Sequence, residues 1–234
     1  MDVPGFLLVD KPAGWTSHDV VAKVRGITGV KKVGHGGTLD PMATGLLVLG
    51  FGKATKQLER FMQGDKTYVA EVTLGATSDT DDAEGTVTPA KRPARPTGTE
   101  VEVTLGSFRG DFQQLPPVYS AIKTNGRKAY AEARKNRTVE RKPRPVTVHE
   151  MVLLDYRWPS IRFRCRVSKG TYVRSIARDV GEKLGTGGYL SALRREAIGS
   201  LEVEAAVGID AVTEQSWHGL VIPSEDAMIN PNPA

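Results

Sequence analysis

The segment Gly34-His35-Gly36-Gly37-Thr38-Leu39-Asp40-Pro41-Met42-Ala43-Thr44-Gly45 has four glycines in twelve residues and one acidic side chain, Asp40. Glycine lets the backbone take positive φ and approach a ligand closely. The apolar run Leu46-Leu47-Val48-Leu49 that follows predicts a buried strand. Two interpretations of Asp40 are open. It caps a short helical turn that starts at Pro41, or it is a catalytic carboxylate held on a rigid turn.

The glycines of this region do not form a nucleotide-binding loop. A phosphate-binding P-loop needs a glycine five residues before Gly-Lys and a Ser or Thr after the lysine. Around Gly52-Lys53, Leu47 and Ala54 occupy those positions. Gly50-Phe51-Gly52 also lacks the third glycine of a dinucleotide fingerprint.

Composition excludes several classes of protein. The hydrophobic fraction of 39% and the charged fraction of 25% are ordinary for a globular protein. The one cysteine, Cys165, rules out an intramolecular disulfide and a four-cysteine zinc site, and it fits a reducing cytoplasm. No apolar run reaches membrane length, and the N-terminus lacks a secretory signal. The histidines lack ligand spacing; they are His18, His35, His149 and His218.

Basic residues gather in one stretch. Residues 119–144 hold nine Lys or Arg against two Glu, a net charge of +7 in a chain whose total is +5. Tyr119 and Tyr130 lie among these charges, and aromatic rings can stack on bases. Charge alone fits a solvated loop as well as an RNA-binding insertion. The basic and aromatic pattern together favours nucleic acid.

Local patterns predict an alternation of strands and helices. Thr16 and Asp19 are spaced as a capping box, so we expect a helix that starts there and ends at Gly29. A second helix starts near Thr171, its expected N-cap. The other expected strands are 6–9, 66–74, 146–154, 161–167 and 198–203, and the other expected helices are 56–62, 128–136 and 190–195.

Charged side chains outside the insertion raise three further expectations. Residues 79–84 are acidic, but Ala83 and Glu84 break the calcium-loop pattern, so we expect a solvated turn. Arg174 in the first turn of a helix opposes the helix dipole, which suggests a partner elsewhere. The alternating Arg162, Arg164 and Arg166 suggest a face that meets an external polyanion.

The central loop, followed by Gly52-Lys53-Ala54-Thr55-Lys56, resembles the signature of the bacterial tRNA pseudouridine synthase B family. Further segments resemble the family in the same order, over about residues 5 to 228. They are Lys11-Pro12, Lys66-Thr67-Tyr68, residues 114–121, Tyr172-Val173-Arg174, Leu193 before Arg194-Arg195, and residues 221–228.

The resemblance implies an α+β fold. It is a single pseudouridine-synthase domain, residues 1–234, around a mixed, largely antiparallel sheet with flanking helices and a thumb-like insertion at 119–144. It implies that the chain isomerises the T-loop uridine (uridine 55) of tRNA. The implied roles are Asp40 as essential carboxylate, Arg174 as its partner, Tyr172 as proton shuttle, Tyr68 stacked on the base, Leu193 and His35 contacting the RNA, and Lys123, Arg127, Lys128 and Arg134 binding it.

The resemblance also implies what surrounds the reaction. We expect no cofactor and no metal, the tRNA T arm as partner, no membrane, no obligate protein partner, a monomer and a cytoplasmic location. The C-terminal RNA-binding domain of many family members is expected to be absent. Two alternatives stay open, a non-catalytic RNA-binding or RNA-folding module and a metal-dependent nuclease that uses Asp40 with Asp79 or Asp81.

Overall fold

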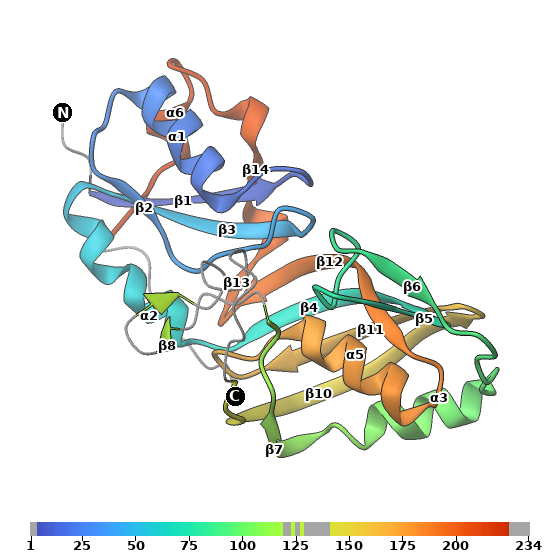
Figure 1. Cartoon of the computed structure of the whole chain (residues 1–234). Coiled ribbons are helices and arrows are strands. Elements are labelled where there is room, and N and C mark those ends of the chain that lie inside the picture. Colours follow the sequence, from blue (N-terminus) through green and yellow to red (C-terminus); the bar gives the residue numbers. More distant parts are fainter. Residues whose placement is uncertain (1–3, 119–122, 125–126, 129–140, 225–234) are drawn as a thin grey trace. The chain divides into compact units, whose positions relative to one another are not determined.

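The computed structural model describes residues 4–118, 123–124, 127–128 and 141–224, and its chain divides into two compact units (Figure 1). The first unit contains residues 1–69 and 193–234, and the second contains residues 70–192. Strands β4 (Lys66–Leu74) and β12 (Gly188–Ile198) belong partly to each.

The first unit is built on a short sheet with helices on both faces. Its strands are β1 (Gly5–Lys11), β2 (Val33–His35), β3 (Thr44–Phe51), β13 (Leu201–Glu202), β14 (Val207–Gly208) and β15 (Ile222–Pro223). Its helices are α1 (Ser17–Thr28), α2 (Leu58–Gln63), α6 (Trp217–Leu220) and the 3₁₀ turns η1 (Gly52–Gln57), η2 (Val203–Ala205) and η3 (Ile209–Ala211). The strand order is β14-β1-β3-β12, with β2 also paired to β3.

The continuous apolar run of β3 is explained by burial on both faces. Leu47 and Leu49 pack in the cluster that contains the α1 side chains, whereas Leu46 and Val48 pack in the cluster that contains the α2 side chains. Successive strand residues point to opposite faces, so a strand covered on both sides is apolar throughout. The prediction of a buried strand is therefore confirmed.

Helix α1 begins and ends at the predicted residues. Thr16 is the N-cap, and its hydroxyl and the Asp19 carboxylate each bond the other residue's backbone N–H. Gly29 closes the helix in the left-handed conformation, φ 68°. Residues with a local physical signal at each end were enough to define this helix.

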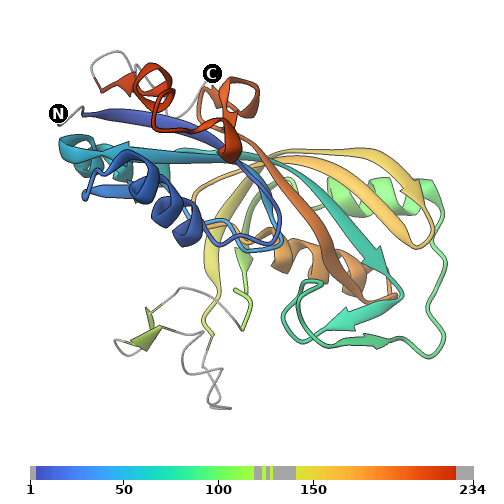
Figure 2. The same cartoon turned by 90° about the horizontal axis from the view of Figure 1, so that it is seen from above.

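The second unit is largely antiparallel, with strand order β12-β4-β11-β10-β7. Helices α3 and α5 lie on one side of β10 and β11 (Figures 1 and 2). Its remaining elements are β5 (Ala76–Ser78), β6 (Val87–Pro89), α3 (Gly98–Gly106), β7 (Gly110–Gln114), β8 (Lys123–Thr124), β9 (Arg127–Lys128), β10 (Arg144–Arg157), β11 (Ser160–Val167) and α5 (Val173–Lys183).

Two helix predictions need correction, and one helix was not predicted. Residues 190–195 are part of strand β12, whose Arg194 and Arg195 pair in parallel with Thr44 and Gly45 of β3. Helix α3 was missed, although Thr97 and Glu100 form a capping box at its start. Lys128 belongs to strand β9, and residues 129–136 of the expected helix lie outside the described residues.

Candidate active site

Asp40 lies on a tight turn between β2 and β3. Its carbonyl accepts a hydrogen bond from the Ala43 N–H at 3.1 Å, and the residue is half-buried. Residues 41 and 42 form a turn rather than a helix, and a capping role for the Asp40 side chain stays a prediction. Because Pro41 has a fixed φ and follows Asp40 directly within this turn, the Asp40 backbone has few alternative conformations.

Lys11, at the end of β1, stabilises this turn through hydrogen bonds to backbone carbonyls. Its side chain is fully buried, and its ammonium group donates to the carbonyls of Pro12 at 2.9 Å, Trp15, and Pro41 at 3.2 Å. The Gly14 N–H donates to the same Pro41 carbonyl at 2.9 Å. A buried ammonium has three N–H donors, and each needs an acceptor. Because one of these acceptors is the Pro41 carbonyl, Lys11 fixes the position of the residue that follows Asp40.

Ser17 fastens the residue before Asp40. Its hydroxyl, in the first turn of α1, accepts from the Leu39 N–H at 2.9 Å and donates to the Leu39 carbonyl at 3.2 Å. The backbone on both sides of Asp40 is thereby bonded to buried side chains, which is how a protein pre-positions a reacting group.

Arg195 in β12 holds the glycine-rich part of the loop. Its side chain is 1% exposed, its Nε donates to the Leu46 carbonyl at 2.8 Å, and Nη2 donates to the Gly37 carbonyl at 3.1 Å. Gly45 must be glycine here, because its φ is +101° and a Cβ would lie 2.2 Å from the Arg195 carbonyl oxygen. The family pattern places two arginines after Leu193, but no local signal shows which of them is buried.

His35 lies at the end of β2, opposite Leu49 of β3. Its Nδ1 is buried and makes no hydrogen bond within the part of the chain that the structure describes. Burial lowers the pKa of His35 below its usual value, and the nearby Arg195 and His18 lower it further. The ring borders an open pocket of about 600 Å³ that Lys32 and Lys56 also line. The two lysines would attract an anionic group such as a phosphate to this pocket.

Tyr68 and Leu193 are the other predicted site residues of the first unit. Both side chains are half-buried, Tyr68 on β4 and Leu193 on β12. The Leu193 carbonyl accepts from the Thr44 hydroxyl at 3.5 Å, next to the turn of Asp40. Their contact with a base stays a prediction.

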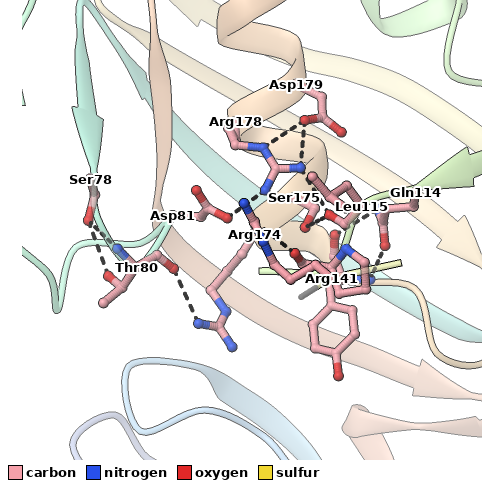
Figure 3. Close-up of polar contacts among 12 residues, drawn as sticks. Ser78, Thr80, Asp81, Gln114, Leu115, Arg141, Arg174, Ser175, Arg178 and Asp179 are labelled. Carbon is pink, nitrogen blue, oxygen red and sulfur yellow. Dashed lines mark hydrogen bonds and ion pairs between the residues drawn. The ribbon is translucent and has the colours of Figure 1, made fainter. Parts of the chain in front are cut away.

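In the second unit, Arg174 has buried partners that the sequence did not reveal. It lies in the first turn of α5, 7% exposed, and its Nη1 donates to Asp82 Oδ2 at 3.1 Å. The same Nη1 donates to the Thr80 carbonyl at 3.3 Å (Figure 3). The expected solvated turn at 79–84 is therefore wrong at Asp82, whose side chain is 3% exposed. The charge of Asp82 offsets the cost of a cation at a helix N-terminus.

Tyr172, rather than Thr171, is the N-cap of α5. Its backbone N–H donates to Gln114 Oε1 at 2.8 Å, and its carbonyl accepts from Gln114 Nε2 at 3.1 Å. Because Gln114 is the last residue of β7 and 2% exposed, it fixes the backbone that carries Tyr172 and Arg174. Asp40 belongs to the first unit and Arg174 to the second, so their pairing stays a prediction.

The structure also describes the arginines of β11 and part of the basic insertion, which were both interpreted as surfaces that meet a polyanion. Arg162 and Arg166 of β11 lie opposite Asp155 and Glu150 of β10, and Arg164 lies 3.6 Å from Glu150. The neighbouring strand thus supplies the acids that the single-strand pattern lacked. Within the insertion, β8 pairs with β9, Lys123 opposite Lys128, whereas Tyr119, Tyr130 and Arg134 lie outside the described residues.

The described residues contain neither a metal-binding cluster nor a membrane-spanning helix. No group of three or more His, Cys, Asp or Glu side chains in that part of the chain could hold a metal ion. Asp81, one acid of the nuclease hypothesis, is instead bonded to Arg178 at 2.8 Å. No described helix is long and apolar enough to cross a membrane.

Known proteins resemble this chain over most of its length. The model of the TruB family pseudouridylate synthase N-terminal domain matches residues 25–173. The tRNA pseudouridine synthase B of Cupriavidus metallidurans is 45% identical over 227 residues, which are 95% of this chain and 72% of that protein. The Thermobifida fusca protein of the same name is 45% identical over 219 residues, which are 90% of this chain and 75% of that protein.

A solved structure agrees with the fold. The crystal structure of a Cbf5-Nop10-Gar1 complex contains a chain that is 28% identical, with a TM-score of 0.74. The match covers 95% of this chain, which spans 61% of that solved chain. With the sequence matches, it shows that the chain belongs to the TruB family of pseudouridylate synthases.

Proposed function

We propose that this chain is a tRNA pseudouridine synthase that isomerises the T-loop uridine, uridine 55, with Asp40 as the essential carboxylate. The observation that carries the proposal is the turn of Asp40, whose flanking backbone is bonded to the buried side chains of Lys11 and Ser17. The relatives named tRNA pseudouridine synthase B support the substrate. A carboxylate held this firmly is suited to act on one atom of a bound nucleotide.

The reaction exchanges no group with another molecule. The C1′–N1 bond of uridine breaks, the base turns, and C1′ bonds to C5, while the C5 proton leaves and N1 gains a proton. The uridine is stacked within a folded loop, so it must leave the stack to reach Asp40. Tyr68 stacks on the extruded base, which is worth about 1–3 kcal/mol. A redox cofactor has no step to perform in such an isomerisation.

The remaining side chains assist Asp40. Arg174 keeps the carboxylate ionised and orients it, since a neighbouring cation favours the charged form. Tyr172 carries the C5 proton away, Leu193 excludes water, and His35 contacts the RNA. The insertion binds the tRNA backbone through Lys123, Arg127, Lys128 and Arg134. The chain acts as a monomer in the cytoplasm, on the T arm of tRNA.

The decisive experiment incubates the chain with unmodified tRNA that carries tritium at C5 of uridine. The proposal expects tritium release and pseudouridine at position 55 on nucleoside analysis, in EDTA as well as without it. Asp40→Asn should abolish release while tRNA affinity stays within a few fold. Asp210→Asn, an exposed acid of the same unit, is the matched control. Wild-type chain that binds tRNA but releases no tritium would instead favour the non-catalytic RNA-binding module.

The insertion is tested by the salt dependence of tRNA binding. Neutralising Lys123, Arg127, Lys128 and Arg134 together should flatten the log–log plot of affinity against salt, because fewer phosphates are then neutralised by the protein. The slope should change by about 0.7–0.9 for each such phosphate. The control neutralises four exposed cations elsewhere, Lys23, Lys91, Arg92 and Arg157. Equal slopes for the two variants would show that the insertion does not bind the RNA.

A further inference from the structure

Two arginines of α5 and two consecutive aspartates form a paired cluster in the second unit. Arg174 and Arg178 are four residues apart, which places them on one face of the helix. Arg174 Nη1 contacts Asp82 Oδ2 at 3.1 Å, and Arg178 Nη1 contacts Asp81 Oδ2 at 2.8 Å. Figure 3 shows Asp81 beside Arg178, with Arg174 one helical turn away. Arg178 has no part in the proposed chemistry, so its half-buried position and its ion pairs need a separate explanation.

Asp81 is held in a conformation that non-glycine residues rarely adopt. Its φ is +63°, the one positive value among the described non-glycine residues. Its carboxylate is 13% exposed, and burial raises the pKa of Asp81 while Arg178 opposes that rise. Its carbonyl also accepts from the Leu190 N–H at 3.0 Å. Such strain persists where surrounding contacts impose it, which indicates that the position of this turn matters.

Arg178 also donates a hydrogen bond to the segment between β7 and the insertion. Its Nη2 donates to the Leu115 carbonyl at 3.0 Å, and the Ser175 hydroxyl donates to the same oxygen at 3.0 Å. Leu115 follows β7 directly. The carbonyl of the next residue, Pro116, accepts from Arg141 Nη1 at 3.1 Å. Arg141, near the end of the insertion, therefore contacts the segment that precedes the insertion, next to the residue that Arg178 binds.

We infer that Arg178 is a positioning residue that holds two parts of the site in register: the Asp81-Asp82 turn that buries Arg174, and the Leu115 carbonyl in the segment that precedes the RNA-binding insertion. The inference rests on the proposed function. One guanidinium group suits this role, because its planar donors can serve a carboxylate and a carbonyl at once. Asp179, which accepts from Arg178 Nε at 2.8 Å, keeps the guanidinium plane fixed.

The test combines Asp81→Asn, Arg178→Met and the double variant. Two quantities are measured for each, the single-turnover rate of tritium release at saturating chain and the dissociation constant for tRNA. Asp81→Asn removes the ion pair but keeps the Leu115 hydrogen bond, so the rate should fall about tenfold, as expected for a displaced reacting group, with tRNA affinity nearly unchanged. Arg178→Met removes both interactions, so the rate and the affinity should both fall. The double variant should match Arg178→Met.

The controls separate positioning from general stability. Asp79→Asn alters an exposed acid of the same turn, and Arg157→Ala removes an exposed arginine of the same unit; both should match wild type. Arg178→Lys should recover part of the rate that Arg178→Met loses, without restoring full affinity. A purely structural role would lower the melting temperature and the fraction of active chain but leave the rate per active site unchanged. That result, or additive effects in the double variant, would overturn the inference.

Failure of the proposed function gives a different pattern. A wild-type chain that releases no tritium overturns the function regardless of the variants. The effect of Arg178→Met on tRNA affinity then still tests the link to the insertion, and unchanged affinity overturns that link. If Arg178→Met does not fold, the isosteric Asp81→Asn alone decides through its rate.

Discussion

Replacing Arg195 by Met should destabilise the chain and slow its reaction, whereas the same change at the adjacent Arg194 should do neither. Arg195 Nε and Nη2 donate to the carbonyls of Leu46 and Gly37 at 2.8 and 3.1 Å, and the side chain is 1% exposed. Hydrogen bonds from a charged donor contribute about 1.5–3 kcal/mol each, so two contribute about 3–6 kcal/mol before the desolvation of the cation is subtracted.

We therefore expect Arg195→Met to lower the free energy of unfolding by about 3 kcal/mol, which lowers the melting temperature by about 6–12 °C in a chain of this size. Gly37 lies three residues before Asp40, so the loop should also lose its register. A displacement of about 1 Å at a reacting group costs up to about a hundredfold in rate. The single-turnover rate should fall by about tenfold or more at a temperature where the variant is fully folded.

Arg194 provides the control within the same strand. It pairs with Asp10 at 2.7 Å, but the two side chains are 41% and 34% exposed. Solvent screens such pairs, which contribute about 0–1 kcal/mol. Arg194→Met should therefore melt within about 4 °C of wild type. Thermal unfolding and tritium release on both variants decide the matter. Equal destabilisation by the two changes, or a wild-type rate for Arg195→Met, would refute the argument.

Three further predictions concern the first unit. Gly45→Ala should cost more than about 2 kcal/mol because of its positive φ and the Arg195 carbonyl, whereas Gly26→Ala in open space within α1 should stabilise by about 0.5–1 kcal/mol; thermal unfolding compares them. Thr16→Ala should cost about 1 kcal/mol by removing the α1 cap, and Thr16→Ser should not. His35 should titrate below about pH 6.5 by NMR. The unfolded chain then binds more protons than the folded chain below that pH, so stability falls as the pH falls, and His35→Gln should flatten the loss. Titration of His35 above the free value would contradict its burial.

Features with a local cause could be predicted from the sequence. Helix α1 follows from a capping box, apolar residues at helical spacing and a terminal glycine. The run Leu46-Leu47-Val48-Leu49 of β3 is apolar throughout, so its burial follows from composition alone. The glycines and the Asp40-Pro41 pair mark a turn, because only a few residue types adopt its backbone angles. These signals lie within a few residues of the structure they specify.

Only the tertiary structure decided which charged side chains are buried and what they hold. Asp82 and Arg174 are 92 residues apart, and Arg195 reaches a carbonyl 158 residues away. Residues 190–195 are a strand because neighbouring strands pair with β12, and their own periodicity did not predict this. Arg194 and Arg195 are the same residue type, yet Arg194 is half-buried and Arg195 is fully buried, because successive residues of a strand face opposite sides. The sequence by itself determined the turn that carries Asp40, and distant residues brought together by folding determined how firmly it is held.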